Sequence, residues 1–286
     1  MKDVCIVYHK CIEQYFSDIA FAVHNSFIEL DYSSEIKCLD TDDLVINGFD
    51  IVFVVGMHAF HKKTINNERT KYIGWEFEQI AGNNSWNRHK FYCFNLSVNI
   101  FDVIFVDVIS KIEFLKNIKK KVVYLPLCYS KDFNYNLNPT VKDIDVLFYG
   151  TLNRRRLEIL NKIEKKHKVV CIDANNNFVK NEVRANLVSR SKICLNVHFS
   201  NELYFEQHRI IKDVICNNGL VLTEQLSSDN YLKTVLQEKY ENLNKKINEL
   251  LEVPEIQRQN LSKITFDELQ KKLLTNELKK ALEVIE

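Results

Sequence analysis

The residues best suited to hold a charged ligand lie in the stretch DIDVLFYGTLNRRRLEIL, residues 143 to 160. A buried strand is expected to end at Gly150, a polar loop through Thr151 follows, and a helix begins near Arg154. Glycine allows close backbone approach, and the helix N-terminus with Arg154, Arg155 and Arg156 favours a diphosphate. The stretch is not the GxGxxG fingerprint of dinucleotide sites. Three successive arginines on a helix point in different directions, so at most two of them can bind one ligand. The alternative is an ordinary strand, loop and helix whose arginines are solvated.

A second candidate segment, residues 192 to 224, combines acidic and basic side chains at a helix start. A buried strand runs into Asn196 and His198, and a helix opens near Glu206. Glu206 and Arg209 are spaced i, i+3, so they share one helix face. A carboxylate there accepts hydrogen bonds from ribose hydroxyls, and the arginine pairs with phosphate.

This second segment also has a plainer interpretation. In this interpretation Glu206 caps the helix and forms an ion pair with Arg209, and the i, i+3 spacing suits that role equally well. His208 is typical of a helix surface or of packing rather than of catalysis.

Proton transfer needs a base, and the first half of the chain has candidates at expected strand ends. His9 ends the run VCIVYH, and His58 follows IVFVVGM. An imidazole with a near-neutral pKa on a loop suits this task, and His58 is the preferred candidate; packing or solvation is the alternative for His9. Glu76 and Glu78, in the segment EFEQ, are the carboxylate candidates, although Glu78 alternatively braces a domain interface.

Metal and redox sites are not expected. His58, His61 and Glu68 invite a metal interpretation, but HAFHKK is a loop without a clear third ligand. The eight cysteines form no CxxC pair and several lie in apolar runs, which indicates buried free thiols in a reducing compartment. The sequence shows no signal peptide and no membrane span, so a cytoplasmic protein is expected.

The charge balance argues against nucleic acid as a partner. Lys and Arg total 39 against 38 acidic residues, a net charge of +1. This balance gives no overall attraction to a polyanion. The run KNIKKK, residues 116 to 121, is the candidate for a local basic face, and it is also typical of a solvated helix end.

Short runs rich in Val, Ile and Phe alternate with amphipathic segments along the chain. Continuous hydrophobicity is what a strand covered on both faces requires, and helical patterns lie between the runs, as over residues 11–30 and 155–166. This order predicts an α/β protein with parallel sheets. The expected strands cover residues 4–8, 35–39, 51–55, 103–106, 122–125, 146–149, 169–172, 193–197 and 220–223.

Two such series predict two Rossmann-like domains that face a cleft. The polar stretch 134–142 is typical of a linker between a domain of residues 1–133 and a second of residues 143–230. Residues 231–286 are almost wholly helical in pattern, lack strand signals, and are expected to pack across both domains. Ligands of such sheets bind at the carboxyl ends of the strands.

These motifs, in this order, resemble those of GT-B glycosyltransferases. In that family a strand ends in YG before an N-x-R-R helix start, and a later segment contains N-I-H, E-x-H-R-I and a strand that ends in S-E. YIGWEFEQI (residues 72–80) and VVYLPLCYS (residues 122–130) resemble motifs of the family's N-terminal half. The matching residues of the later segment are Asn196, His198, Asn201, Glu206, His208, Arg209, Ile210, Thr223 and Glu224.

The resemblance implies a UDP- or GDP-sugar held by the C-terminal domain, with no metal and no further cofactor. Gly150 and Arg154 or Arg155 then face the diphosphate, and the stretch from Asn196 to His198 lies beside the base. Arg209 offsets charge on the leaving nucleotide. The acceptor, a glycan, a lipid-linked glycan or a protein, is expected against the N-terminal domain.

One position departs from the family pattern in the donor half. Lys212 stands where the family has a Glu that contacts the ribose, so either Asp213 or Glu206 substitutes for it or donor binding is weakened. Cys128 similarly stands where the family has Gly. A non-catalytic GT-B-like binding or scaffold protein is therefore one alternative to a transferase that acts on a glycan, a lipid or a protein. A DNA-modifying glycosyltransferase is a second alternative, because some phage enzymes share the GT-B architecture.

Overall fold

Two compact units make up the computed structural model of the chain. The first comprises Met1–Asp132 and Leu273–Glu286, and the second comprises Phe133–Lys272. None of the helices in the described ranges has the length and apolar character that crossing a bilayer requires. The structure describes residues 2–63, 69–80, 85–118, 120–137, 141–174 and 179–285.

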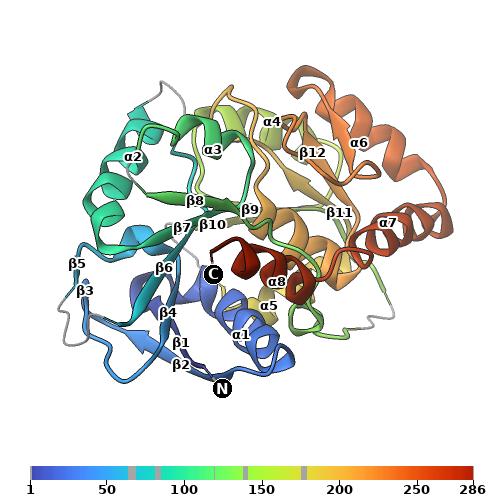
Figure 1. Ribbon diagram of the computed structural model, residues 1–286. Coiled ribbons are helices and arrows are strands. Elements are labelled where there is room, and N and C mark those ends of the chain that lie inside the picture. The colour runs from blue at the N-terminus through green and yellow to red at the C-terminus, as the bar shows by residue number, and fades with distance from the viewer. Residues whose placement is uncertain are drawn as a thin grey trace. The chain divides into compact units, whose positions relative to one another are not determined.

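A six-stranded parallel sheet forms the centre of the first unit, with the strand order β2-β1-β4-β6-β7-β8. Figure 1 shows helices against the faces of this sheet, and α1 and α8 pack side by side there. The strands are β1 (Asp3–His9), β2 (Ser33–Leu39), β4 (Ile51–Val55), β6 (Lys71–Glu76), β7 (Val103–Val106) and β8 (Lys121–Tyr124), with a separate pair β3 (Asp43–Leu44) and β5 (Lys62–Lys63). The helices are α1 (Glu13–Glu29), α2 (Ser85–Ser97), α3 (Ser110–Phe114) and α8 (Leu274–Ile285).

Continuous apolar runs place β1 and β4 in the middle of this sheet. Every residue of β4 is buried, as a strand covered by helices on both faces requires. Trp75 of β6 is fully buried, packs edge-on against Phe53 at 6.0 Å between ring centroids, and donates its indole N–H to the Leu125 carbonyl at 3.0 Å. The apolar strands thus hold β6 in a fixed position.

The chain turns sharply at the end of β4. Gly56 has a φ of +73°, and a Cβ at this position would lie 2.5 Å from the Ile12 side chain. Only glycine combines that backbone conformation with so close an approach. The turn leads into a short 3-10 helix, Met57–Ala59, which carries His58.

The second unit is built on a five-stranded parallel sheet with the order β10-β9-β11-β12-β13. Its apolar strands pack against α4 and α6 in one core cluster. The strands are β9 (Ile144–Gly150), β10 (Val169–Asp173), β11 (Ser191–Asn196), β12 (Val221–Glu224) and β13 (Leu236–Glu238). The helices are α4 (Arg154–Glu164), α5 (Asn181–Arg190), α6 (Leu243–Glu252), α7 (Glu255–Leu269) and the π-helix η5 (His208–Val214).

The parallel α/β class and all nine expected strands are confirmed, but three segments differ from expectation. The sequence did not predict β6, and it predicted no strand where β13 forms. The segment 231–286 is divided, because α6 and α7 belong to the second unit and α8 to the first. Pro139, central to the expected linker, lies outside the described residues.

Candidate functional site

The carboxyl edge of the second sheet gathers most of the side chains expected to bind a donor. β9 ends at Gly150, β11 at Asn196 and β12 at Glu224. These strands are parallel, so their carboxyl ends share one edge of the sheet. The helix α4 begins at the same edge, and the Asn153 side chain caps it by accepting from the Arg156 N–H at 2.9 Å.

Arg209, Glu206 and Asn196 form a polar network at this edge. The Arg209 Nη1 lies 3.0 Å from the Glu206 Oε2 and donates to the Asn196 Oδ1 at 3.2 Å. Burial opposes the charge on Glu206, but the charges of Arg209 and then Arg156 outweigh it and lower the pKa of this carboxyl. The expected i, i+3 pair is therefore present, and Glu206 is ionised.

Arg209 also lies directly against Gly150. The glycine has a φ of +143°, and a Cβ there would lie 2.8 Å from the Arg209 Nη2. The Tyr149 hydroxyl donates to the Arg209 carbonyl at 3.1 Å, and the guanidinium lies 5.6 Å from the centre of the Tyr149 ring. Gly150 thus makes room for the guanidinium group rather than for a ligand alone.

The arginines at the start of α4 point in different directions, as helical geometry requires. The Arg154 side chain is 94% exposed and pairs with Glu158 at 3.2 Å, so, contrary to expectation, it points away from this edge. Arg156, the third arginine of the run, is 2% exposed. It donates to the carbonyls of Val197 at 2.9 Å and Thr151 at 2.8 Å, and burial lowers its pKa to about 10.

At the same edge, the Arg155 guanidinium contacts the side chains of Glu224, Asn201 and Tyr240. Its Nη1 donates to the Glu224 Oε2 at 2.7 Å and its Nη2 pairs with the other oxygen of that carboxylate. Its Nε donates to the Asn201 Oδ1 at 2.8 Å, and its guanidinium carbon lies 3.9 Å from the centre of the Tyr240 ring. The backbone N–H of His198 donates to the same Glu224 carboxylate at 3.1 Å. This rigid arrangement fixes the backbone after β11.

Asp213 belongs to a neighbouring ion cluster instead of an open binding surface. It lies 3.0 Å from the Arg184 Nε and 2.7 Å from the Lys212 Nζ, and Lys212 is 2% exposed. The Asp213 carboxylate is thus engaged by two cations, and its expected contact with the ribose stays a prediction. His208 is half-buried at the first position of η5.

The edge carries an excess of positive charge. Three guanidinium groups, of Arg155, Arg156 and Arg209, face two carboxylates, of Glu206 and Glu224. The neighbouring cluster contributes two more cations against one carboxylate. Buried charge of one sign in excess favours a ligand of the opposite sign. Asp173, at the end of β10, adds a further carboxylate to this edge and accepts from the Leu152 N–H at 3.2 Å. The remaining excess of cations is suited to binding an anion.

A second group of titratable side chains lies at the carboxyl edge of the first sheet. His58 Nδ1 is 3.5 Å from the Glu76 Oε1, and His58 Nε2 is 3.6 Å from the Glu78 Oε1. Lys90 pairs with the same Glu78 oxygen at 3.0 Å. Burial disfavours a charged imidazole, but Glu76, and after it Glu78, reverses this effect and raises the pKa of His58. The two expected candidates, His58 and Glu78, are thus brought together.

Two further buried residues complete this group, and the sequence did not single them out. Lys111 and Asp107 are 2% and 1% exposed and pair at 2.5 Å. Lys111 also donates to the Glu76 carbonyl at 3.4 Å. Burial, only partly offset by Lys111, raises the pKa of Asp107 to about 6. A charged side chain directly after an apolar strand, as in IFVD, was the available sequence signal.

The remaining histidine candidates have other contacts. The His9 Nδ1 accepts from the Cys11 N–H at 3.0 Å, and its ring packs edge-on against Phe60. The His61 Nε2 lies 3.2 Å from the His58 carbonyl, and Glu68 lies outside the described residues. In the described ranges no three His, Cys, Asp or Glu side chains are grouped as ligands of a metal ion.

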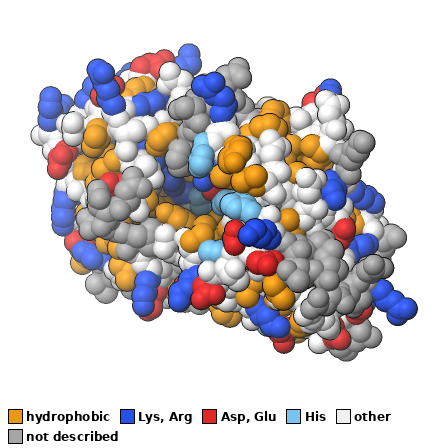
Figure 2. Space-filling view, turned by 90° about the vertical axis from the view of Figure 1, so that its left-hand side faces the viewer, with side chains coloured by type: hydrophobic (Ala, Val, Ile, Leu, Met, Phe, Trp, Pro, Cys, Tyr) orange, Lys and Arg blue, Asp and Glu red, His pale blue; other side chains and the backbone are white. Residues whose placement is uncertain are grey.

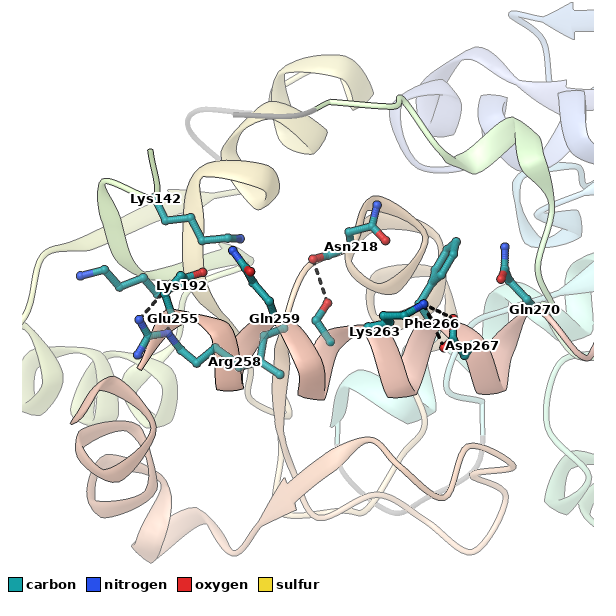
Figure 3. A pocket seen from close by; sticks show the side chains of 12 residues that line it. Lys142, Lys192, Asn218, Glu255, Arg258, Gln259, Lys263, Phe266, Asp267 and Gln270 are labelled. Atoms are coloured by element: carbon teal, nitrogen blue, oxygen red, sulfur yellow. Dashed lines mark hydrogen bonds and ion pairs between the residues drawn. The ribbon is translucent and has the colours of Figure 1, made fainter. Parts of the chain in front are cut away.

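A pocket of about 330 Å³ lies at the opposite, amino edge of the second sheet (Figure 3). Its cationic walls are already engaged: the Lys142 Nζ donates to the Ser191 carbonyl at 2.8 Å, and Lys192 pairs with Asp145 at 2.6 Å. Arg258 likewise pairs with Glu255. The cations of this pocket are thus held by protein groups, Lys142 by backbone carbonyls and the other two by carboxylates.

On the face shown in Figure 2, Lys and Arg side chains alternate with Asp and Glu without a continuous basic area. In the run 116–121, Lys116 pairs with Glu113, and Lys121 donates to the Val284 carbonyl near the end of α8. Lys119 lies outside the described residues.

Comparison with known proteins places the fold. No known protein family matches the sequence, and no curated protein is similar to it. A solved alpha-glucosyltransferase in complex with UDP and a 13-mer DNA that contains an HMU base matches with a TM-score of 0.66 at 9% identity, over 99% of each chain. The N-terminal domain of Candida albicans trehalose-6-phosphate phosphatase matches with 0.62 at 9% identity, over 97% of this chain and 95% of that one. HepE from Anabaena, in complex with UDP-glucose, matches with 0.60 at 9% identity, over 100% and 99%. The chain therefore has the two-sheet α/β fold of the GT-B glycosyltransferases, as the sequence resemblance implied.

Proposed function

We propose that this protein is a glycosyltransferase that moves a sugar from a nucleoside diphosphate sugar to a hydroxyl of an acceptor. The observation that carries this proposal is the buried excess of guanidinium groups at the carboxyl edge of the second sheet. UDP- and GDP-sugars present an anionic diphosphate, which guanidinium groups bind through charge-assisted hydrogen bonds. The second unit is the donor-binding part in this proposal.

Arg209 is the residue that we assign to the leaving group. Its guanidinium is 13% exposed, so it is partly desolvated and interacts strongly with nearby charge. Negative charge grows on the diphosphate as its bond to the sugar breaks, and a preorganised arginine stabilises that charge without reorganisation. Arg209 supplies this stabilisation through its side chain, so the proposed reaction requires no metal ion.

The acceptor is assigned to the first unit. His58 is only 10% exposed and has Glu78, which is 25% exposed, next to its Nε2. A hydroxyl placed at this nitrogen can lose its proton to the imidazole. We propose a glycan, a lipid-linked glycan or a protein as acceptor, in the cytoplasm, where the free thiols of all eight cysteines persist.

DNA is the second candidate acceptor, because the similar alpha-glucosyltransferase was solved with a DNA oligonucleotide. The two proposals differ in salt dependence. Contacts with several phosphates make binding fall steeply as salt rises. Fluorescence anisotropy with a duplex at increasing salt separates them: steep salt-dependent binding supports DNA, and its absence supports the other acceptors.

A thermal-shift screen over nucleoside diphosphates and their sugars tests the proposed function. A ligand that binds the native state stabilises the protein and so raises its melting temperature. At a free ligand concentration of 100 times Kd the free energy of unfolding increases by about 2.7 kcal/mol. We expect UDP, GDP or one of their sugars to stabilise the protein, and slow hydrolysis of the matching sugar nucleotide without acceptor. No stabilisation by any of them contradicts the proposal.

A further inference from the structure

The pocket at the amino edge of the second sheet contains a lysine whose charge no carboxylate balances (Figure 3). The Lys142 Nζ donates to the carbonyls of Ser189 and Ser191, at 3.2 and 2.8 Å. An ammonium group has three N–H donors, so these two carbonyls leave a third for another acceptor. Within the described ranges, Lys142 forms no ion pair with an acidic side chain. Burial lowers the pKa of Lys142, so a neighbouring anion would stabilise its charged form.

The other cations that line the pocket each have a carboxylate partner. These ion pairs join Arg258 to Glu255 at 2.7 Å, Lys263 to Asp267 at 3.3 Å and Lys192 to Asp145 at 2.6 Å. Backbone carbonyls offset the Lys142 charge in part, because Ser189 lies in the last turn of α5, where the helix dipole is negative. That partial charge is smaller than the charge of a carboxylate. Lys142 therefore carries the excess positive charge of the pocket.

The walls of the pocket are otherwise rich in amide side chains. Gln259, Phe266 and Gln270 line it from α7 and its C-terminal cap, at spacings that place them on one face of the helix. Asn218 lines it from a turn that α7 holds, since the Ser262 hydroxyl donates to the Asn218 carbonyl at 2.8 Å. Each amide offers donors and an acceptor, as hydroxyl groups require, and the phenyl ring offers an apolar surface. The volume of about 330 Å³ is at the lower end of the range of small-molecule sites.

We infer that this pocket binds a sugar acid, with the carboxylate of the ligand at the Lys142 Nζ and its hydroxyl groups at the surrounding amides. Those amides are the side chains of Gln259, Gln270 and Asn218. One unbalanced cation matches the single charge of a carboxylate, whereas a phosphate monoester carries about 1.5–2 charges at neutral pH. The C–H face of a monosaccharide is apolar and suits the ring of Phe266.

This site is separate from the donor edge. Every residue that lines it belongs to the second unit, Phe133–Lys272, so it does not involve the first unit. It shares no residue with the arginine and glutamate network around Arg209 at the carboxyl edge. The inference therefore adds a second ligand to the proposed glycosyltransferase and does not depend on that function.

The test is isothermal titration calorimetry of glucuronate into the full chain. Glucuronamide is the control ligand, because it has the same shape and hydroxyl groups without the charge. We expect glucuronate to bind and glucuronamide to bind at least tenfold more weakly, since a hydrogen bond to a charged group is lost. Acetate, which has the charge without the hydroxyl groups, should also bind more weakly than glucuronate. Equal binding of glucuronate and glucuronamide, or preferred binding of inorganic phosphate, overturns the inference.

Three variants locate the site. Lys142→Met should weaken glucuronate binding at least tenfold, and Lys245→Met, at an 81% exposed position of α6, should leave it unchanged. Lys142 also holds two carbonyls, so Gln259→Ala, at an exposed position, tests the site if K142M does not fold, and it should weaken binding several-fold.

The outcomes separate this inference from the proposed function. Unchanged affinity in Q259A and in a folded K142M, or no binding of glucuronate to wild type, overturns the inference. If glucuronate binds as expected while no nucleoside diphosphate binds wild type, the proposed function fails and the sugar-acid site stands.

Discussion

Replacement of Gly150 by alanine is the sharpest single change at the donor site. A Cβ at this position lies 2.8 Å from the Arg209 Nη2, and ordinary contact begins at 3.4 Å. The guanidinium must therefore retreat by about 0.6 Å, the difference of these two distances. A shift of this size alters the geometry of the 3.2 Å hydrogen bond that the Arg209 Nη1 donates to Asn196. A misplaced guanidinium also meets the diphosphate incorrectly.

The expected loss of affinity follows from the charge of the group that moves. A hydrogen bond to a charged group contributes about 1.5–3 kcal/mol, so we expect the Kd for the nucleoside diphosphate to rise about 10- to 150-fold. The φ of +143° adds backbone strain of about 1–3 kcal/mol for a non-glycine residue. Isothermal titration calorimetry measures the first effect, and chemical denaturation measures the second.

Gly48→Ala is the matched control for Gly150→Ala. Gly48 also has a positive φ, of +85°, but a Cβ there meets nothing within 4 Å. We expect this variant to lose stability through strain and to bind nucleoside diphosphate as tightly as wild type. A Gly150→Ala protein with unchanged affinity refutes the assignment of Arg209 to the diphosphate.

Three further predictions concern other parts of the chain. Arg154→Ala should leave the affinity for the donor unchanged, because the Arg154 side chain is 94% exposed. Arg155→Ala should weaken donor binding, because Arg155 holds the Glu224 carboxylate. Isothermal titration calorimetry compares the two variants. Burial raises the pKa of Asp107 from 3.8 to about 6, so the native state holds this proton more tightly than the unfolded chain. We therefore expect wild type to lose stability relative to Asp107→Asn as pH rises from 4 to 6. Chemical denaturation at several pH values measures this difference in unfolding free energy, and an increase with pH contradicts the prediction. Leu278 is fully buried in α8, so Leu278→Ala should lower the free energy of unfolding by about 2–5 kcal/mol, measured by chemical denaturation. A change near zero would contradict the packing of α8 in the core.

The strands were largely predictable because buried parallel strands are continuous apolar runs. Within the six-stranded sheet the exception is β6, in which Lys71, Gly74 and Glu76 interrupt the run KYIGWE. Gly74 is required there, since a Cβ would lie 2.8 Å from the Met57 sulfur. Glu76 breaks the pattern because it belongs to the candidate site, and local rules commonly fail at such positions.

The sequence located the donor edge but not the orientation of its arginines. Helical geometry separates successive side chains by about 100°, so the residue at which α4 begins decides which of them points inward. Asn153 caps the helix and sets this phase. Arg156 then lies three and four residues before the buried Ile159 and Leu160, on the face that packs against the sheet. Reading that spacing from the cap would have identified Arg156.

The division of the C-terminal segment was not predictable in the same way. The amphipathic patterns of α6 and α8 require an apolar partner but do not specify which sheet supplies it. The structure places α8 in the first unit, where Lys71 donates to the Ile285 carbonyl at 3.0 Å. Such a long-range contact leaves no local trace in the sequence.

The most direct measurement is calorimetric titration of nucleoside diphosphates into wild type, Arg209→Ala and Arg190→Ala. Arg190 pairs with Asp143 at the opposite edge of the sheet and controls for loss of an arginine as such. We predict that UDP or GDP binds wild type and R190A alike and binds R209A at least tenfold more weakly. Equal binding to R209A and wild type, or no binding to wild type, contradicts the assignment of this edge as the diphosphate site.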